Sequence, residues 1–160
     1  MKTAASIVDV RRAGPEDATS VLDMVREIAA HEGDVSDVSG TPETWAAMLA
    51  RPDVVVLIAE RDGRPVGYVS AVRKLHLWRG EDILALDDVF VRDGHRDAGV
   101  GRLLMTELAR LASADRLLIR WEMQEDNVAA QRFYTRLGAS LRTKVIAEWS
   151  PEAQRAALGS

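Results

Sequence analysis

The chain has 160 residues, of which 47% are hydrophobic and 29% are charged, which suits one soluble domain with its own core. The formal net charge of -4 argues against bulk nucleic acid or an anionic membrane surface as the partner. The sequence contains no cysteine, which excludes disulfides, thiolate metal sites and an acyl-cysteine intermediate. Residues 1–7 lack a long apolar core and no window approaches eighteen apolar residues, so we expect a cytoplasmic protein without export signal or membrane span.

The first half of the chain predicts a strand, two helices and a strand pair. Alternation over 7–11 indicates the strand, and apolar residues at three- and four-residue spacing indicate a helix that ends at Gly33. The sequence Thr-Pro-Glu at 41–43 places a capping residue, a proline and an acid where a helix starts. It predicts a second helix that ends at about 51. Two β-rich runs, 54–60 and 65–75, flank an Asp-Gly pair that is typical of a tight antiparallel turn.

The second half predicts four more strands and three helices. A strand over 83–91 contains an acidic pair, Asp87 and Asp88, in an otherwise apolar stretch. After it we expect a leucine-rich helix, a strand over 117–123, a helix over 127–137, strands around Ser140 and over 145–149, and a short helix from 151 to about 158. The pattern predicts an α/β (α+β) fold in a single domain over 1–160, with a mixed sheet of about seven strands flanked by helices.

A glycine-containing turn, Arg-Asp-Ala-Gly-Val-Gly-Arg at 96–102, connects the strand over 83–91 to the leucine-rich helix. The N–H groups at 99–102 are the unpaired donors of the helix's first turn, and they favour an anion. Two glycines let a pyrophosphate approach the backbone, while Arg96 or Arg102 supplies charge. The spacing matches neither a dinucleotide fingerprint nor a nucleotide-triphosphate loop, so it indicates another phosphate carrier. An ordinary strand-to-helix turn is the alternative.

Two motifs carry a resemblance to a known family. Arg-x-x-Gly-x-Gly at 96–101 resembles the acetyl-CoA pyrophosphate loop of the GNAT superfamily of N-acetyltransferases. The segment 127–139 is similar to the family's Asn-x-x-Ala-x-x-Phe-Tyr-x-x-x-Gly helix, one strand downstream. Matches at Trp78-x-Gly80, at 86–91 and at 28–32 resemble the spermidine/spermine (diamine) group. The resemblance implies a mostly antiparallel sheet with a splayed strand pair, 83–91 and 117–123, that forms the acetyl-CoA cleft.

The resemblance also implies a mechanism of direct acetyl transfer from acetyl-CoA to an amine, without metal. Tyr134 would be the general acid for the thiolate, which suits a phenol with a pKa near 10; a core aromatic beside Phe133 is the alternative. Asp87 would contact the substrate amine and accept its proton through water. Strand alternation sends Asp87 and Asp88 to opposite faces unless a bulge intervenes, so Asp88 would be structural and bond loop backbone. The alternative is that both carboxylates lie at a solvated strand end or cap the phosphate loop.

The expected cofactor contacts follow from the same resemblance. The backbone of the strand would pair with the pantetheine arm, and the Val89 N–H would polarise the acetyl carbonyl. Asn127 would line the cleft or simply cap its helix. The full set is Val89, Phe90, Val91, Arg96, Asp97, Ala98, Gly99, Val100, Gly101, Arg102, Asn127 and Ala130. Asp97 departs from the family pattern because it brings a negative charge to a phosphate site.

Substrate contacts are expected at His31, Glu32, Asp87, Trp121 and Glu122. His31 and Glu32 would reach a distal amine, or else be exposed charges at a helix end, and alternation lets only Trp121 or the Arg120/Glu122 face point inward. His76 and His95 lack metal-ligand spacing and are expected at the surface.

The resemblance implies acetylation of a primary amine of a small cationic molecule, polyamine- or amino-acid-like, by an expected homodimer. The segment 142–144, Arg-Thr-Lys, replaces the acidic segment of diamine-type members and would suit a substrate with a carboxylate. The alternatives are an aminoglycoside or other amine-antibiotic acetyltransferase and a non-catalytic acyl-CoA-binding sensor of the same fold.

Overall fold

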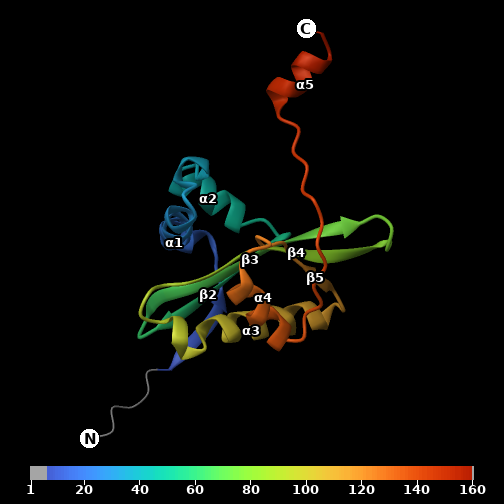
Figure 1. Cartoon of the computed structure of the whole chain (residues 1–160). Coiled ribbons are helices and arrows are strands. Elements are labelled where there is room, and N and C mark those ends of the chain that lie inside the picture. Colours follow the sequence, from blue (N-terminus) through green and yellow to red (C-terminus); the bar gives the residue numbers. More distant parts are fainter. Residues whose placement is uncertain (1–6, 160) are drawn as a thin grey trace, which may run out of the picture. The chain divides into compact units, whose positions relative to one another are not determined.

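The computed structural model describes residues 7–159, apart from the side chain of Asp97. These residues form two compact units, one that ends at Glu122 and one that begins at Met123 (Figure 1). The first contains the sheet and three helices, and the second contains two helices. Each unit is described by itself below.

The sheet of the first unit has five strands in the order in which they occur along the chain. The first four pair antiparallel, and the fifth pairs parallel to the fourth. The expected mixed, mostly antiparallel sheet is therefore confirmed. The strands are β1 (Val8–Arg12), β2 (Val54–Arg61), β3 (Arg64–His76), β4 (Glu81–Val91) and β5 (Leu118–Arg120).

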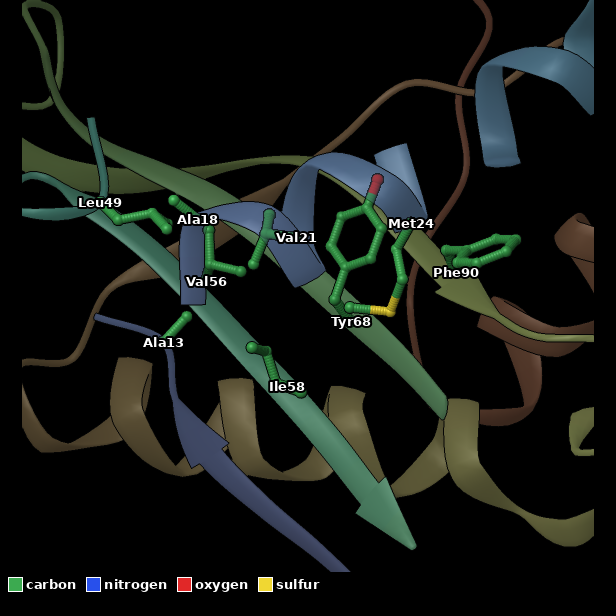
Figure 2. Close-up of a cluster of buried hydrophobic side chains, with 9 residues drawn as sticks. All are labelled: Ala13, Ala18, Val21, Met24, Leu49, Val56, Ile58, Tyr68 and Phe90. Atoms are coloured by element: carbon green, nitrogen blue, oxygen red, sulfur yellow. The ribbon is translucent and has the colours of Figure 1, made fainter. Parts of the chain in front are cut away.

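Helices cover both faces of this sheet (Figure 1). Helices α1 (Ala18–Glu32) and α2 (Pro42–Leu49) lie on one face, and α3 (Val100–Ala114) lies on the other. The α1 face holds a cluster of buried side chains, which Figure 2 shows with the ring of Tyr68 rising from β3 toward α1. The cluster consists of Ala13, Ala18, Val21, Met24, Leu49, Val56, Ile58, Tyr68 and Phe90.

The turn from β1 into α1 depends on one ion pair. The guanidinium of Arg11 donates to both carboxylate oxygens of Asp17, over 2.8 and 2.7 Å, and also to Glu60 over 2.7 Å. Asp17 accepts a further hydrogen bond from the Gly14 N–H over 2.9 Å, so it closes the 3-10 turn Pro15–Asp17 that starts α1. Its side chain is only 10% exposed. The same helix ends as expected at Gly33, whose φ of 82° is left-handed.

The second unit holds α4 (Val128–Arg136) and α5 (Pro151–Ala157). The predicted strands around Ser140 and over 145–149 do not form, so the described residues contain five strands rather than about seven. Residues 140–150 are exposed throughout, with Val145 at 96%. An alternating pattern becomes a strand only where a neighbouring strand satisfies its N–H and C=O groups. For the same reason the strand predicted over 117–123 shortens to β5, which pairs with β4 over three residues.

Candidate active site

A β-bulge in β4 is the central feature of the candidate site. Val69 pairs with Val89 and Ala71 pairs with Leu86, so Ser70 on β3 faces two residues, Asp87 and Asp88. Such an extra residue breaks the regular alternation of the strand. The acidic pair that stood out in the sequence is therefore the bulge itself.

The bulge places both carboxylates on one face of the sheet. Tyr68 and Val72 share a face of β3, and their partners on β4 are Phe90 and Ala85. Asp88 lies two residues before Phe90, and Asp87 lies two residues after Ala85, so both belong to this same α1 face. The bulge, which was the stated exception to opposite faces, is therefore present, and the two side chains do not alternate.

Tyr68 and Ser70 hold Asp88 at this position. The Tyr68 hydroxyl donates to Oδ2 of Asp88 over 3.1 Å, and the Asp88 N–H donates to the Ser70 hydroxyl oxygen over 3.2 Å. Asp88 therefore bonds a tyrosine side chain and not the loop backbone that we expected. Neither Tyr68 nor Ser70 was predicted as a site residue, since only the strand register reveals that they face the acidic pair.

The two carboxyl groups differ in their surroundings. Burial raises the pKa of Asp88, and the hydrogen bond from Tyr68 opposes that rise. Burial and the neighbouring Asp88 charge raise the pKa of Asp87, while the Lys74 ammonium lowers it. A carboxyl with a raised pKa holds a proton more readily, which is what a general base at neutral pH requires.

The end of α1 adds a third carboxylate to this region. Burial raises the pKa of the Tyr68 hydroxyl, and the charges of Asp88, Glu32 and Asp87 raise it further. Glu32 is exposed, and its charge acts on the same Tyr68 hydroxyl as the charges of the two aspartates. His31, its neighbour, lies with Nε2 at 4.0 Å from Oδ2 of Asp93. Together the three carboxylates make this part of the α1 face strongly acidic.

One edge of β4 is open beside the bulge. The N–H groups of Asp88 and Arg92 point toward β3, where they meet the Ser70 side chain and the Val66 carbonyl. By alternation the N–H groups of Val89 and Val91 point to the opposite edge. On that edge β4 pairs with β5 only over Ile83–Ala85, so within residues 7–159 no strand follows it further. Two backbone donors are thus available to an extended ligand. The open edge results from the short length of β5, which pairs with β4 over all of its three residues, and the splayed pair over 83–91 and 117–123 stays a prediction.

The glycine-containing turn ends at the start of α3. Gly99 has a φ of 75°, and no side chain caps the helix, so its first N–H groups are available for an anion. A Cβ at Gly99 would meet no atom within 4 Å, which leaves room in front of the turn. Arg96 bonds back to the strand: its Nε donates to the Val91 carbonyl over 3.1 Å, and its Nη2 lies 3.2 Å from Asp93.

The remaining residues of this turn differ in their exposure. Arg102 and Ala98 are exposed, Gly101 is half-buried, and Val100, the first residue of α3, is buried. The side chain of Asp97 lies outside the described residues. Uncapped N–H groups, flanking arginines and an open strand edge fit a pyrophosphate-bearing group with an extended arm, such as acetyl-CoA.

Three of the predicted residues belong to the second unit. Asn127 caps α4, since its Oδ1 accepts the Ala130 N–H over 3.1 Å. Tyr134 is buried, and its ring meets Phe133 edge-on with 5.1 Å between centroids. The local geometry of α4 thus agrees with the helix cap that was the alternative for Asn127. The cofactor-binding roles of Asn127 and Ala130 and the catalytic role of Tyr134 stay predictions.

Other candidates lie near the ends of strands. Trp121 is half-buried and Glu122 is exposed at the end of the first unit. His95 and His76 are both half-buried rather than free on the surface, and Nη1 of Arg61 lies 2.8 Å from Nδ1 of His95. Over the described residues, no three His, Asp or Glu side chains gather as a metal site would require. None of the helices in the described part is long and apolar enough to cross a membrane.

Comparison with known proteins identifies the family. The sequence model of the Acetyltransferase (GNAT) family matches residues 22–139. The aminoalkylphosphonate N-acetyltransferase of Salmonella typhimurium is 28% identical over 135 residues, 82% of this chain and 84% of that protein.

Solved structures share the fold at lower identity. An aminoglycoside acetyltransferase from an uncultured soil metagenomic sample has a TM-score of 0.76 at 18% identity, covering 91% of this chain and 98% of its own. A second aminoglycoside acetyltransferase from such a sample, in complex with trehalose, has a TM-score of 0.78 at 14% identity. The match covers 89% of this chain and 95% of that enzyme. The ribosomal-protein-alanine N-acetyltransferase of Brucella melitensis has a TM-score of 0.72 at 18% identity, covering 88% and 97%.

Proposed function

Because the chain belongs to the acetyltransferase (GNAT) family and is therefore an acetyl-CoA-dependent acyltransferase, we propose that it acetylates a primary amine of a small cationic molecule, polyamine- or amino-acid-like. Transfer occurs directly in a ternary complex. The observation that carries this proposal is the bulge in β4, which sets an acidic pair beside an open strand edge. A chain without cysteine agrees with transfer that needs no thiol nucleophile on the enzyme.

The acidic residues act on the amine. Asp87, Asp88 and Glu32 attract an ammonium group to the α1 face by their combined charge. An ammonium must lose a proton before its nitrogen can attack, and Asp87 takes that proton, through water. The raised pKa of Asp87 supports this role, since a more basic carboxylate accepts a proton more readily.

The backbone of β4 acts on the acetyl group. When bound, acetyl-CoA supplies the acetyl as a thioester, whose carbon–sulfur bond breaks as the nitrogen–carbon bond forms. The Val89 N–H points to the open edge and donates to the acetyl oxygen, where negative charge develops. The N–H of Val91, two residues on, binds the extended arm, and the first turn of α3 binds the pyrophosphate with Arg96 and Arg102.

Tyr134 completes the proton balance. The departing thiolate needs one proton, and the phenol of Tyr134 donates it. The Phe-Tyr pair in α4 supports this role through its likeness to the family motif. Asn127 and Ala130 line the same cofactor site from the start of α4, and His31, Trp121 and Glu122 contact the substrate.

The named relatives support an amine acceptor. One acts on aminoalkylphosphonates and two on aminoglycosides, and all of these compounds carry amino groups. The likeness to the two aminoglycoside enzymes makes an aminoglycoside the second candidate acceptor. We further propose that the enzyme is a cytoplasmic homodimer that acts on small molecules and binds neither nucleic acid nor membrane, as its family resemblance and net charge suggest.

Release of free thiol from acetyl-CoA tests the proposal. The panel contains polyamines, amino acids, aminoalkylphosphonates, aminoglycosides and lysine peptides, and a thermal shift with CoA runs beside it. We expect turnover on one class of small amine together with a CoA-dependent shift. Turnover confined to peptides would contradict the small-molecule acceptor. A CoA shift without turnover on any amine would support a non-catalytic acyl-CoA sensor instead.

A further inference from the structure

A pocket of about 380 Å³ lies at the hairpin end of β3 and β4, where these two strands continue past β2. Its polar lining consists of Lys74, His76 and Arg120, and apolar side chains complete it, among them Ile83 and the exposed Trp78. The pocket is open to solvent, and its volume is enough for one small polar group at the surface.

The pocket is on the same face of the sheet as the acidic pair. Lys74 and His76 follow Tyr68 by even numbers of residues along β3, so they share its face. Lys74 pairs with Ile83, and Arg120 on β5 stands beside Ala85. Ile83, Ala85 and Asp87 alternate along β4 on that face. A ligand on this surface therefore passes from the pocket to Asp87 without crossing the sheet.

The charge of the pocket lining is positive. No acidic side chain lines it, and within the described part of the chain Lys74 and Arg120 form no hydrogen bond or salt bridge, although the Lys74 charge also acts on Asp87. The nearest acids on β4 are already paired: Asp82 with Arg73 over 2.8 Å, and Glu81 with Arg79 over 2.7 Å.

The ring of His76 also lines the pocket. Its Nδ1 is buried and has no hydrogen-bond partner among the residues described. Because that nitrogen is covered by protein atoms, a ligand in the pocket does not contact it with the ring as it stands. The pocket thus offers two cations, Lys74 and Arg120, beside the His76 ring, and paired cations suit an oxyanion.

The distance to the acidic pair suits a single short molecule. Arg120 is the β5 partner of Ala85, so the backbones of these two residues are about 5 Å apart. Asp87 follows Ala85 by two residues, a distance of about 7 Å along β4. The Lys74 ammonium is close enough to lower the pKa of Asp87. An anion in the pocket and an ammonium at Asp87 can therefore be the two ends of one small molecule.

We propose that this pocket binds an oxyanion, a carboxylate or a phosphorus oxyanion, at the far end of the amine substrate. The inference rests on the proposed function and deepens it: the substrate class is a short amine that also carries an anion. The acidic pair binds the end that is acetylated, while Lys74 and Arg120 bind the other end. A polyamine would place a cation against these two cations and is disfavoured.

Matched amines and matched variants test this assignment. The amines are propylamine, 4-aminobutyrate and 3-aminopropylphosphonate, which distinguish no anion, a carboxylate and a phosphorus oxyanion. With the wild type we expect kcat/KM to be at least tenfold higher for one anion-bearing amine than for propylamine. Arg120→Gln should reduce that advantage through KM and leave propylamine unchanged. Lys74→Gln with Arg120→Gln should remove the rest of the advantage and also move the acid limb of all three amines to higher pH, because Lys74 lowers the pKa of Asp87. The control is Arg79→Gln, which removes a paired cation from the same hairpin. It should change neither the advantage of the anion-bearing amine nor the turnover of propylamine.

A binding measurement that needs no turnover accompanies the kinetics. Methylphosphonate or acetate at millimolar concentration should raise the melting temperature of the wild type and not that of the double variant. Equal losses on all three amines in Arg120→Gln, or a wild type that prefers propylamine or a diamine, would overturn the anion subsite and leave amine acetylation intact. Absence of thiol release with every amine would contradict the proposed function and, with it, this inference.

Discussion

The hydroxyl of Tyr68 donates a hydrogen bond to Asp88 over 3.1 Å, from a side chain that is itself 0% exposed. The ring packs in the core between β3 and α1, so the hydroxyl has a fixed position (Figure 2). Asp88 in turn sits in the bulge that directs the Val89 N–H to the open edge of β4. Core packing thereby determines the geometry of the candidate active site, which a surface loop could not do as rigidly.

Tyr68→Phe should change the pH dependence of catalysis. The variant removes the donor that opposes the effect of burial on Asp88, so the pKa of Asp88 rises further. Because the Asp88 charge helps to attract the ammonium, we expect the acid limb of 1/KM for the amine to move to higher pH. The acid limb of kcat, which reports the base Asp87, should not move to higher pH, since a protonated Asp88 no longer raises the pKa of Asp87. Ile58→Val, in the same core cluster, costs about 0.5–1.5 kcal/mol of stability and should leave the acid limb in place. Equal pH profiles for wild type and Tyr68→Phe would refute this role.

Asp17→Ala should destabilise the fold by about 1–3 kcal/mol, since Arg11 and the Gly14 N–H both lose their acceptor. The Arg11 hydrogen bond holds the pKa of Asp17 below its ordinary value of 3.8. Because the folded pKa is the lower one, the stabilisation is complete above pH 3.8 and is lost as pH falls through the folded pKa.

Urea unfolding at pH 7 and at pH 2–3 measures both effects. The difference between wild type and Asp17→Ala should be large at pH 7 and small at the acidic end. Asp23→Ala is the control, since Asp23 is exposed and its Arg26 partner lies 3.9 Å away; it should cost less than about 0.5 kcal/mol. A difference that grows on acidification would contradict the sign.

Gly67→Ala should cost about 1–3 kcal/mol of stability. A Cβ at this position would lie 2.5 Å from the Phe90 carbonyl oxygen and 3.2 Å from Cα of Val91, so β3 and β4 would have to separate beside the open edge. In Gly99→Ala the new Cβ would lie within 4 Å of no atom. The variant should lose only about 1–2 kcal/mol of stability, the cost of a side chain at a left-handed φ of 75°. Chemical denaturation should therefore show a lower free energy of unfolding for Gly67→Ala than for the wild type. Amine turnover by Gly67→Ala should also fall, because the spacing of β3 and β4 changes. Full turnover in Gly67→Ala would show that the strand spacing is not critical.

Tyr134→Phe should lower kcat by about 10²–10³ without unfolding the protein. The phenyl ring keeps the packing against Phe133, while the proton donor for the thiolate is gone. Single-turnover kinetics with acetyl-CoA over a pH series isolate the chemical step. If the variant retains full kcat at every pH, Tyr134 is not the acid.

Local sequence signals predicted most elements of the fold. Gly33 ends α1, Thr41 and Ser150 cap α2 and α5, and the Asp-Gly turn joins β2 to β3, because each depends on residues close in the chain. The strands predicted within 140–150 do not form. A strand needs a neighbouring strand to pair with, and the residues of 140–150 do not reveal whether one is present.

The site was harder to predict than the fold. The motif at 96–102 and the acidic pair were visible in the sequence, since both interrupt apolar patterns. The sequence left a bulge open as an exception but could not locate it, because a change of register exists only between two strands; the bulge brings Asp87 and Asp88 to the same face. Tyr68, Ser70 and the cations Lys74 and Arg120 gained significance only through that register.

The rate of thiol release by Asp87→Asn tests the central claim most directly. Asparagine keeps the shape of the side chain and cannot take the proton of the amine. We predict that kcat/KM for the amine falls by about 10²–10⁴ while acetyl-CoA still raises the melting temperature as in the wild type. Because the pKa of Asp87 is raised in the folded state, its charge opposes folding at neutral pH, so the variant should be no less stable. An Asp87→Asn enzyme with wild-type turnover would show that the bulge in β4 does not supply the base.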